Sequence, residues 1–186
     1  MSNDIYVVIE HLRGNVSEIS YVMLAAGRQL ADSTGGELSA VLLGSGAEDL
    51  ASDLAATRVL YFDDNNLADF TPGPYVQCLN GLISADQPRA VLLGHTSIGM
   101  EVASLLSVKA ELPLINSCLN FASEGDALQY TSQLYGGKIY AEGEIPGPTS
   151  LLTVVPGGYK AEEGQSSSAP PITRVEVPDL SDLKIT

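Results

Sequence analysis

The sequence predicts an α/β fold in which a doubly wound, mostly parallel sheet carries helices on both faces. Over the first two-thirds of the chain, short continuous apolar runs alternate with segments of helical periodicity. Such runs are typical of strands that are buried on both sides. The length of 186 residues is enough for one domain. A hydrophobic content of 45% excludes a chain that is disordered throughout.

Four strand–helix units are expected in this region. The strands are expected at residues 5–9, 38–43, 59–62 and 90–93. The helix after the first strand has its apolar residues at helical spacing, and Gly35 and Gly36 are expected to end it. Its apolar face consists of Ile19, Val22, Met23, Ala26 and Leu30.

The starts of the first two helices are predicted from capping residues. Asn15 with Glu18, and Ser45 with Glu48, have the spacing of a capping box. A capping box satisfies the free N–H groups of a first helical turn. The second of these helices is therefore expected to begin near Ser45 and to continue through residues 49–56.

The third and fourth helices follow the third and fourth strands. Thr71 and Pro72 are expected as the N-cap and first-turn proline of a helix that ends near residue 83. The fourth helix follows the loop at residues 94–99. Its apolar face is expected to consist of Ile98, Val102, Leu105 and Leu106.

The last third of the chain changes its pattern, because no helix is expected between its strands. Strands are expected at residues 114–121, 128–134, 138–144 and 150–155, with Gly136 and Gly137 in a hairpin turn. An antiparallel extension on the last edge of the parallel sheet is the natural interpretation. Residues 1–160 are therefore assigned to one α/β domain. Residues 161–186 are assigned to a linker and a C-terminal strand or tail.

The charge balance excludes several classes of partner. With 23 acidic against 9 basic side chains, the chain has a formal net charge of −14. A surface that neutralises phosphates is not expected, so neither nucleic acid nor an anionic membrane is an expected partner. No apolar run approaches the ~20 residues of a membrane span. Cys78 and Cys118 lack metal or redox spacing, which favours a reduced, cytoplasmic compartment.

The loop at residues 94–99 is the strongest candidate for a ligand site, with Gly94, His95, Thr96, Ser97 and Gly99 as the binding residues. It leaves the carboxyl end of a parallel strand and enters a helix, where free amides and the helix dipole suit an anion or a ribose phosphate. The alternative is purely structural: Ser97 caps the helix and the glycines permit a tight turn.

The loop at residues 44–49 is a weaker candidate. It resembles a dinucleotide fingerprint, and Asp63 and Asp64 follow at the distance of a ribose-binding acid. However, Asp49 replaces the third glycine, and Glu48 adds a second carboxylate that would repel a phosphate. Solvated loops are the alternative interpretation for these acids.

The two histidines, His11 and His95, are both expected at the carboxyl edge of the sheet. They could serve metal or acid–base chemistry. No metal-binding spacing and no nucleophile-elbow motif accompanies them, so no catalytic residue is assigned.

Four ordered blocks resemble the alpha subunit of electron transfer flavoproteins. They are IYVVIEHLRGNVSEISYVMLAAGRQLADSTGGELSAVLLG, PRAVLLGHTSIGMEVASLLSVKAELPLIN, LYGGKIYAEGEI and TVVPGGY. The resemblance covers about residues 4–160. It implies a Rossmann-like domain related to adenine-nucleotide (alpha hydrolase-like) modules. It also implies a heterodimer with a beta-type subunit, in which FAD carries electrons from flavin dehydrogenases.

The chain departs from this family pattern at several positions. Met100 and Glu101 replace the usual basic residue of the loop, Asn116 and Ser117 replace an Asp, and Val155 replaces an Arg. The family's second domain, which supplies most of the FAD site, is not found before Thr186, and PDLSDLKIT resembles the approach to it. A shortened alpha subunit is one interpretation.

The resemblance predicts a non-catalytic scaffold and docking domain. Its expected partners are a beta-type subunit and a separate flavin domain, with a homodimer as an alternative. FAD is implied for the complex rather than for this chain alone. Two other functions stay open: an AMP-binding module that uses the 94–99 loop, and a small enzyme that uses His95.

Overall fold

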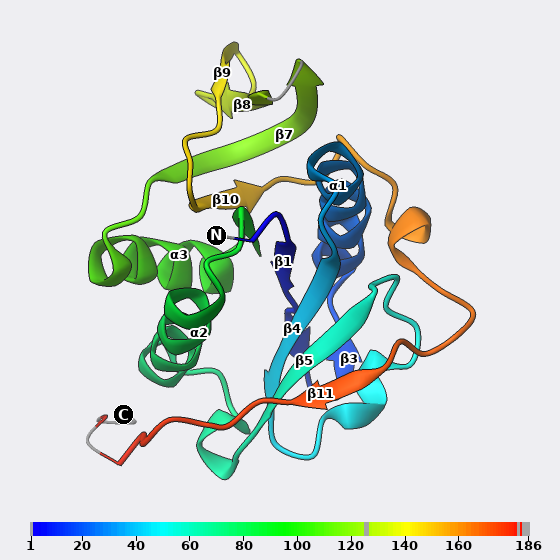
Figure 1. The fold of residues 1–186 in the computed structure, drawn as a ribbon, viewed down its shortest axis with the longest axis vertical. Coiled ribbons are helices and arrows are strands. Elements are labelled where there is room, and N and C mark those ends of the chain that lie inside the picture. Colours follow the sequence, from blue (N-terminus) through cyan, green and yellow to red (C-terminus); the bar gives the residue numbers. More distant parts are fainter. Residues whose placement is uncertain (1, 125–126, 182, 184–186) are drawn as a thin grey trace.

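The computed structural model describes residues 2–124, 127–181 and 183, and its main feature is a nine-stranded sheet (Figure 1). The strand order is β11-β5-β4-β1-β6-β10-β7-β8-β9, and every neighbouring pair from β11 to β7 in this order is parallel. The strands are β1 (Ile5–Val8), β4 (Leu38–Gly44), β5 (Arg58–Asp63), β6 (Ala90–Gly94), β7 (Leu114–Glu124), β8 (Ala127–Leu134), β9 (Ile139–Glu144), β10 (Ser150–Val154) and β11 (Ile172–Arg174). A separate hairpin consists of β2 (His11–Leu12) and β3 (Asn15–Val16).

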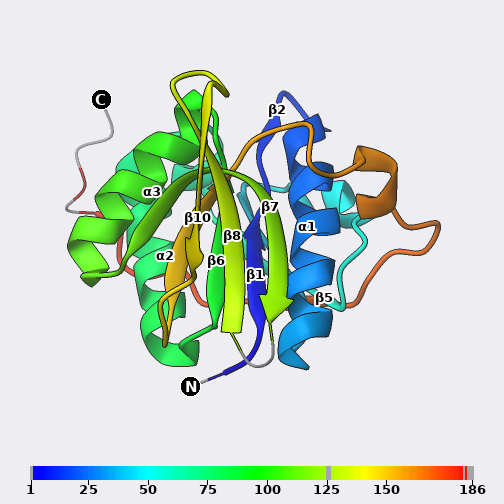
Figure 2. The ribbon, with the colours of Figure 1, turned by 90° about the horizontal axis from the view of Figure 1, so that it is seen from above.

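Helices cover both faces of the sheet (Figure 2). α1 (Glu18–Thr34) packs on one face, and α2 (Pro72–Asp86) and α3 (Ser97–Ala110) pack on the other. The chain steps from β1 through β4 to β5 in one direction and then crosses back to β6. Right-handed crossovers therefore place the helices of the two halves on opposite faces. The direction reverses between β1 and β6, and this pair is the topological switch point of the sheet.

The core has two halves because neighbouring residues of a strand point to opposite faces. In β1, Ile5 and Val7 belong to the apolar cluster under α1, whereas Tyr6 and Val8 belong to the cluster under α2 and α3. All four are at most 4% exposed. The doubly wound α/β architecture predicted from continuous apolar runs is thus confirmed.

Both predicted capping boxes are wrong. The N-cap of α1 is Ser17, since Asn15 pairs with Leu12 in the β2–β3 hairpin and is not free to cap a helix. The second predicted helix is only a short 3₁₀ helix, η1 (Glu48–Ala51), whose N-cap is Ala47. The Ser45 hydroxyl instead donates to Asn65 Oδ1 at 3.1 Å, near a second short helix, η2 (Asn65–Leu67).

Other helix ends agree with the sequence. The C-cap of α1 is Gly35, whose left-handed φ of 66° suits a residue without Cβ. The N-cap of α2 is Thr71, and the helix continues past residue 83 to Asp86. No helix in the described part of the chain is long and apolar enough to cross a membrane.

The antiparallel extension is confirmed for β7, β8 and β9, but the strand expected at residues 150–155 does not belong to it. β10 returns to the middle of the sheet and pairs in parallel with both β6 and β7. Every residue of β10 is buried, which is the pattern of a central strand rather than an edge strand. Its apolar sequence could have indicated this position.

The C-terminal segment lies across the outside of the sheet and the helices. The short helix η3 (Ala161–Gly164) packs so closely on α1 that a Cβ at Gly164 would lie 1.9 Å from the Tyr21 carbonyl oxygen. The edge strand expected in this segment is β11, which pairs in parallel with β5. Leu180 is 4% exposed and belongs to the core under α2 and α3. Whether residue 160 is a domain boundary stays a prediction.

Candidate functional site

The 94–99 loop lies at the switch point, where β6 ends beside β1. Gly94 is the last residue of β6, and Thr96 is the N-cap of α3. The Thr96 side-chain oxygen accepts a hydrogen bond from the Gly99 N–H at 3.0 Å. The alternative in which Ser97 caps the helix is therefore wrong, because Ser97 is the first helical residue and its side chain is exposed.

A carboxylate of the chain itself lies against this loop. Glu10 follows β1, and its Oε1 and Oε2 atoms lie 2.8 and 3.0 Å from the Thr96 hydroxyl, which donates to them. The residue is only 7% exposed. Its backbone is held by Ser20 of α1, whose hydroxyl oxygen accepts from the Glu10 N–H at 2.8 Å. Glu10 is thus fixed in place from both the sheet and the helix.

The two glycines of the loop make room for this carboxylate. A Cβ at Gly94 would lie 2.4 Å from Glu10 Oε1. A Cβ at Gly99 would lie 2.1 Å from the Gly94 carbonyl oxygen and 2.8 Å from Glu10 Oε1. These distances are far below van der Waals contact. The two glycines thus allow the side chain of Glu10 to approach the loop closely.

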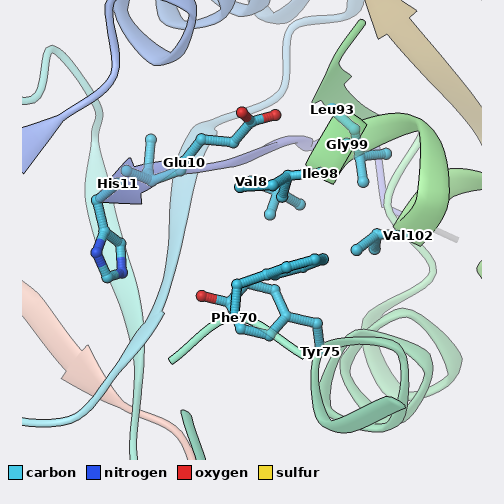
Figure 3. Close-up of a pocket in the computed structure, with 10 residues that line it drawn as sticks. Val8, Glu10, His11, Phe70, Tyr75, Leu93, Ile98, Gly99 and Val102 are labelled. Atoms are coloured by element: carbon cyan, nitrogen blue, oxygen red, sulfur yellow. The ribbon is translucent and has the colours of Figure 1, made fainter. Parts of the chain in front are cut away.

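The pocket below the loop is nearly closed. Figure 3 shows the rings of Phe70 and Tyr75 under Val8 and Ile98, while the side chains of Glu10 and His11 point in different directions. The two rings pack edge to face, with centroids 5.1 Å apart. A free volume of about 10 Å³ leaves room for one water molecule at most. A nucleotide base does not enter this pocket as it stands.

An open groove of about 600 Å³ lies outside this pocket. Its walls are the β2–β3 hairpin, the 44–49 loop and the segment before α2. Arg13 contributes a cation to the described lining, whereas Asp49 and Asp69 contribute two carboxylates. The groove is large enough for a small ligand, but its charges do not favour an anion.

The 44–49 loop is also filled by the chain's own side chains. Asp63 Oδ1 accepts from the Gly46 N–H at 2.8 Å and from the Tyr61 hydroxyl at 3.0 Å. The Tyr61 oxygen in turn accepts from the Ala47 N–H at 2.6 Å. The hydrogen bonds to Asp63, led by that from the Gly46 backbone, lower its pKa. The acid expected near a ribose binds the loop instead.

Arg174 of β11 completes this second cluster. Its Nη1 donates to Asp63 Oδ2 at 2.9 Å, its Nη2 donates to Glu48, and its guanidinium lies 5.6 Å from the centre of the Tyr61 ring. The two carboxylates raise the pKa of Arg174, the Glu48 hydrogen bond contributing most. The C-terminal segment therefore supplies a cation to Glu48 of the 44–49 loop and to Asp63 at the end of β5.

The two histidines lie at the carboxyl edge of the sheet but bond to different strands. His11 Nε2 donates to the Leu43 carbonyl oxygen of β4 at 2.7 Å, since a carbonyl can only accept. His95 bonds to β10 and β7: Nδ1 lies 3.0 Å from Thr153 Oγ1, and Nε2 lies 3.0 Å from Ser117 Oγ. They do not form one site.

The hydrogen bonds around His95 define its tautomer. The Thr153 hydroxyl donates its proton to Asn116 Oδ1, so it accepts from His95 Nδ1–H, and Ser117 donates to Nε2. Burial lowers the pKa of His95 and so favours its neutral form. Neither histidine has a carboxylate partner among these bonds. The described residues hold no cluster of three or more potential metal ligands.

A pH dependence is expected from Glu10. Burial raises its pKa, and hydrogen bonds from the Thr96 hydroxyl and the Gly94 backbone oppose only part of that shift. A carboxyl group with a raised pKa stabilises the fold at low pH and loses that contribution as the pH rises through the folded-state value. Glu10→Gln stays neutral, so the free energy of unfolding of the wild type should fall relative to that of the variant as the pH rises from acid to neutral.

Urea denaturation at a series of pH values measures this difference. Glu37→Gln, at an exposed position before β4, is the matched control and should stay parallel to the wild type. Parallel curves for Glu10→Gln and the wild type would contradict a raised pKa of the buried Glu10 carboxyl group.

Comparison with known proteins places the fold in a family. The model of the electron transfer flavoprotein domain matches residues 5–180. The chain belongs to this family. The electron transfer flavoprotein subunit alpha of Bacillus subtilis (strain 168) is 27% identical over 187 residues, which cover 99% of this chain and 57% of that protein. The subunit alpha of Syntrophomonas wolfei is 29% identical, over 92% of this chain and 53% of that protein.

A third relative has a different name within the same family. The acryloyl-CoA reductase electron transfer subunit beta of Anaerotignum propionicum is 28% identical, over 86% of this chain and 51% of that protein. The chain thus spans about half the length of the curated relatives it matches. The resemblance seen in the four sequence blocks is confirmed at the level of the family.

Glu10 is the main residue of the site that the sequence analysis did not single out. It stands directly after an apolar strand, at the edge of the sheet where ligand-binding residues gather. That position was a usable signal. The pairing of Glu10 with Thr96 was not visible in the sequence, because it depends on β1 and β6 lying side by side.

Proposed function

We propose that this chain is the alpha-type scaffold domain of an electron transfer flavoprotein. It docks on a beta-type subunit and supports a flavin domain. The assembly carries electrons, and this domain is not itself a catalyst. Membership of the family and the names of the relatives support the electron-transfer role.

The observation that favours a scaffold over a cofactor site is the filling of both glycine loops. Glu10 lies in the 94–99 loop, and Asp63 and Tyr61 take the Gly46 and Ala47 N–H groups of the 44–49 loop. A phosphate at a strand–helix turn needs such N–H groups free. In the 44–49 loop these N–H groups are bonded to side chains of the chain itself. At the 94–99 loop the carboxylate of Glu10 lies against the Thr96 hydroxyl and both glycines.

FAD is the cofactor that the family name implies, and the described residues do not fit a complete FAD site. Its diphosphate requires free backbone N–H groups or several cations. Arg13 is the basic side chain that lines the open groove, and it shares that lining with Asp49 and Asp69. We therefore assign the flavin to the complex and to residues outside this chain.

The test is co-expression with the beta-type subunit of the same organism. Native mass spectrometry of the purified material should show a complex with one copy of each chain. This chain expressed alone should purify without flavin absorbance. Failure to form a complex at micromolar concentration would contradict the docking role, and stoichiometric flavin on the isolated chain would contradict the assignment of FAD to other residues.

The AMP-binding alternative makes a separate prediction. A ligand present at a hundred times its dissociation constant stabilises a protein by about 2.7 kcal/mol. We expect no such gain with AMP, ADP, ATP or FAD, because both glycine loops are occupied. Urea denaturation with and without each ligand measures it. A gain that disappears in Arg13→Ala would instead indicate binding in the open groove, and one that survives would indicate binding elsewhere. Either gain would contradict the expectation.

A further inference from the structure

The open groove beside the β2–β3 hairpin is preformed, because both of its walls are anchored to the same strand residue. His11 Nε2 on the hairpin side donates to the Leu43 carbonyl oxygen at 2.7 Å, and the Tyr75 hydroxyl on the α2 side donates to that oxygen at 3.3 Å. These bonds fix the positions of the two walls, between which about 600 Å³ is free. Ligand sites are usually formed in this way before the ligand binds.

The groove has an apolar side as well as a charged one. Leu12, on the hairpin, is 64% exposed, and Leu50 and Phe70 are half-buried. All three side chains line the groove. A ligand that places an apolar group against them removes apolar surface from water, which favours binding.

Three charged side chains line the groove without pairing with one another. Arg13, Asp49 and Asp69 are all exposed. The ion pairs found among the described residues involve none of the three, so neither carboxylate neutralises Arg13. Charged groups that share one cavity but stay apart can each pair with a different group of one ligand. One cation and two carboxylates therefore fit a small molecule that carries both a carboxylate and an ammonium group.

Arg13 is also an unusual residue for its backbone position. It has a φ of 51° in the two-residue turn of the β2–β3 hairpin, and Gly14 after it has a φ of 75°. Such turns favour asparagine, aspartate or glycine, because these residues adopt the left-handed conformation most easily. Arginine therefore has no advantage for the turn itself. A role of its side chain in the groove accounts for an arginine at this position.

We propose that this groove binds a free α-amino acid with an apolar side chain. The ligand carboxylate pairs with the Arg13 guanidinium, whose N–H groups match the two carboxylate oxygens. The ligand ammonium group has three N–H donors and pairs with the carboxylates of Asp49 and Asp69. The ligand side chain packs against Leu12 and Phe70. This site goes beyond the electron-transfer role and does not depend on it, because the 94–99 loop does not line the groove.

Ligands that lack one charge test the assignment. Isothermal titration calorimetry of this chain at neutral pH should show one site for L-phenylalanine and for L-leucine. Phenylpropionate lacks the ammonium group and phenylethylamine lacks the carboxylate. Each should bind about tenfold more weakly than phenylalanine, since a factor of ten is the lower end of what a hydrogen bond between charged groups contributes. Glycine, which lacks the apolar group, should also bind more weakly.

Substitutions in the groove assign each charge to its partner. Arg13→Gln should weaken the binding of phenylalanine about tenfold but not that of phenylethylamine, which has no carboxylate to lose. Asp69→Asn should weaken the binding of both compounds, because both carry the ammonium group. Arg28→Gln and Asp32→Asn, at exposed positions of α1, are the matched controls and should bind phenylalanine like the wild type.

Three results would overturn the proposal. The first is the absence of binding of either amino acid at tens of millimolar. The second is binding of phenylethylamine or phenylpropionate as tightly as phenylalanine. The third is an affinity for phenylalanine that neither Arg13→Gln nor Asp69→Asn changes, while circular dichroism shows both variants folded. None of these results bears on docking with the beta-type subunit, so the two proposals fail separately.

Discussion

Gly99→Ala should reduce the free energy of unfolding by about 3 kcal/mol, the upper end of the range for overpacking a close-packed interior. The new Cβ would lie 2.1 Å from the Gly94 carbonyl oxygen, which is backbone and cannot rotate away. Relief requires β6 and the start of α3 to separate. That movement would also stretch the bond from Gly99 N–H to Thr96 and disturb Glu10. Urea denaturation followed by circular dichroism measures the loss.

Gly81→Ala in α2 is the matched control. This glycine is also helical, and a Cβ there has no neighbour within 4 Å. Because alanine is the better helix former by about 1 kcal/mol, the control should be slightly more stable than the wild type. Equal small effects at both positions would contradict the close approach of loop and strand at the switch point.

Gly94→Ala should cost about 2–3 kcal/mol in the wild type and much less when Glu10 is also replaced by alanine. The Cβ at Gly94 would lie 2.4 Å from Glu10 Oε1, so the carboxylate would have to leave its place. It would then lose its hydrogen bond from the Thr96 hydroxyl, and bonds to charged groups contribute about 1.5–3 kcal/mol. In Glu10→Ala the nearest remaining neighbour is Ile19 Cγ1 at 3.2 Å.

A double-mutant cycle measures this coupling. The sum of the two single effects should exceed the effect of the double variant Glu10→Ala/Gly94→Ala by about 2 kcal/mol, within the range seen for residues in contact. When Gly99→Ala is combined with Glu10→Ala, much less of the lost stability should be recovered. The main clash of the new Cβ at position 99 is with the backbone carbonyl of Gly94, which Glu10→Ala does not remove. Additive effects of Glu10→Ala and Gly94→Ala would show that the carboxylate does not occupy the loop.

These two experiments bear on function through the same carboxylate. If Glu10 is coupled to Gly94 as expected, the contacts of Glu10 with the 94–99 loop hold β1, β6 and α3 together. Such contacts suit a rigid docking scaffold. The contact with Glu10 also gives the glycines of this strand–helix turn a structural role that does not require a bound nucleotide.

The local elements were predictable because they depend on neighbouring residues. Continuous apolar runs predicted β1, β4, β5 and β6, and helical periodicity with a terminal glycine predicted α1. Capping was less predictable. Asn15 has the right spacing for a cap, but it is taken up by a hairpin whose turn residues, Arg13 and Gly14, both have positive φ.

Strand order was the first feature that depended on distant parts of the chain. The sequence at residues 150–155 indicates a strand but not its neighbours, and only the folded sheet places β10 between β6 and β7. The complete burial of β10 follows from that position. A rule based on sequential order placed it at the edge, because a hairpin directly precedes it.

The sequence by itself determined the α/β class, the family resemblance and the presence of two glycine loops at strand–helix turns. Which side chains lie against those loops was decided only by the tertiary structure. Glu10 reaches Gly94 because β1 and β6 are neighbours, and Asp63 gains its cation because Arg174 lies on β11 beside β5. The conformation of each loop depends on neighbouring residues. The partner of its hydrogen-bonding groups depends on which distant residue the fold brings within hydrogen-bond distance.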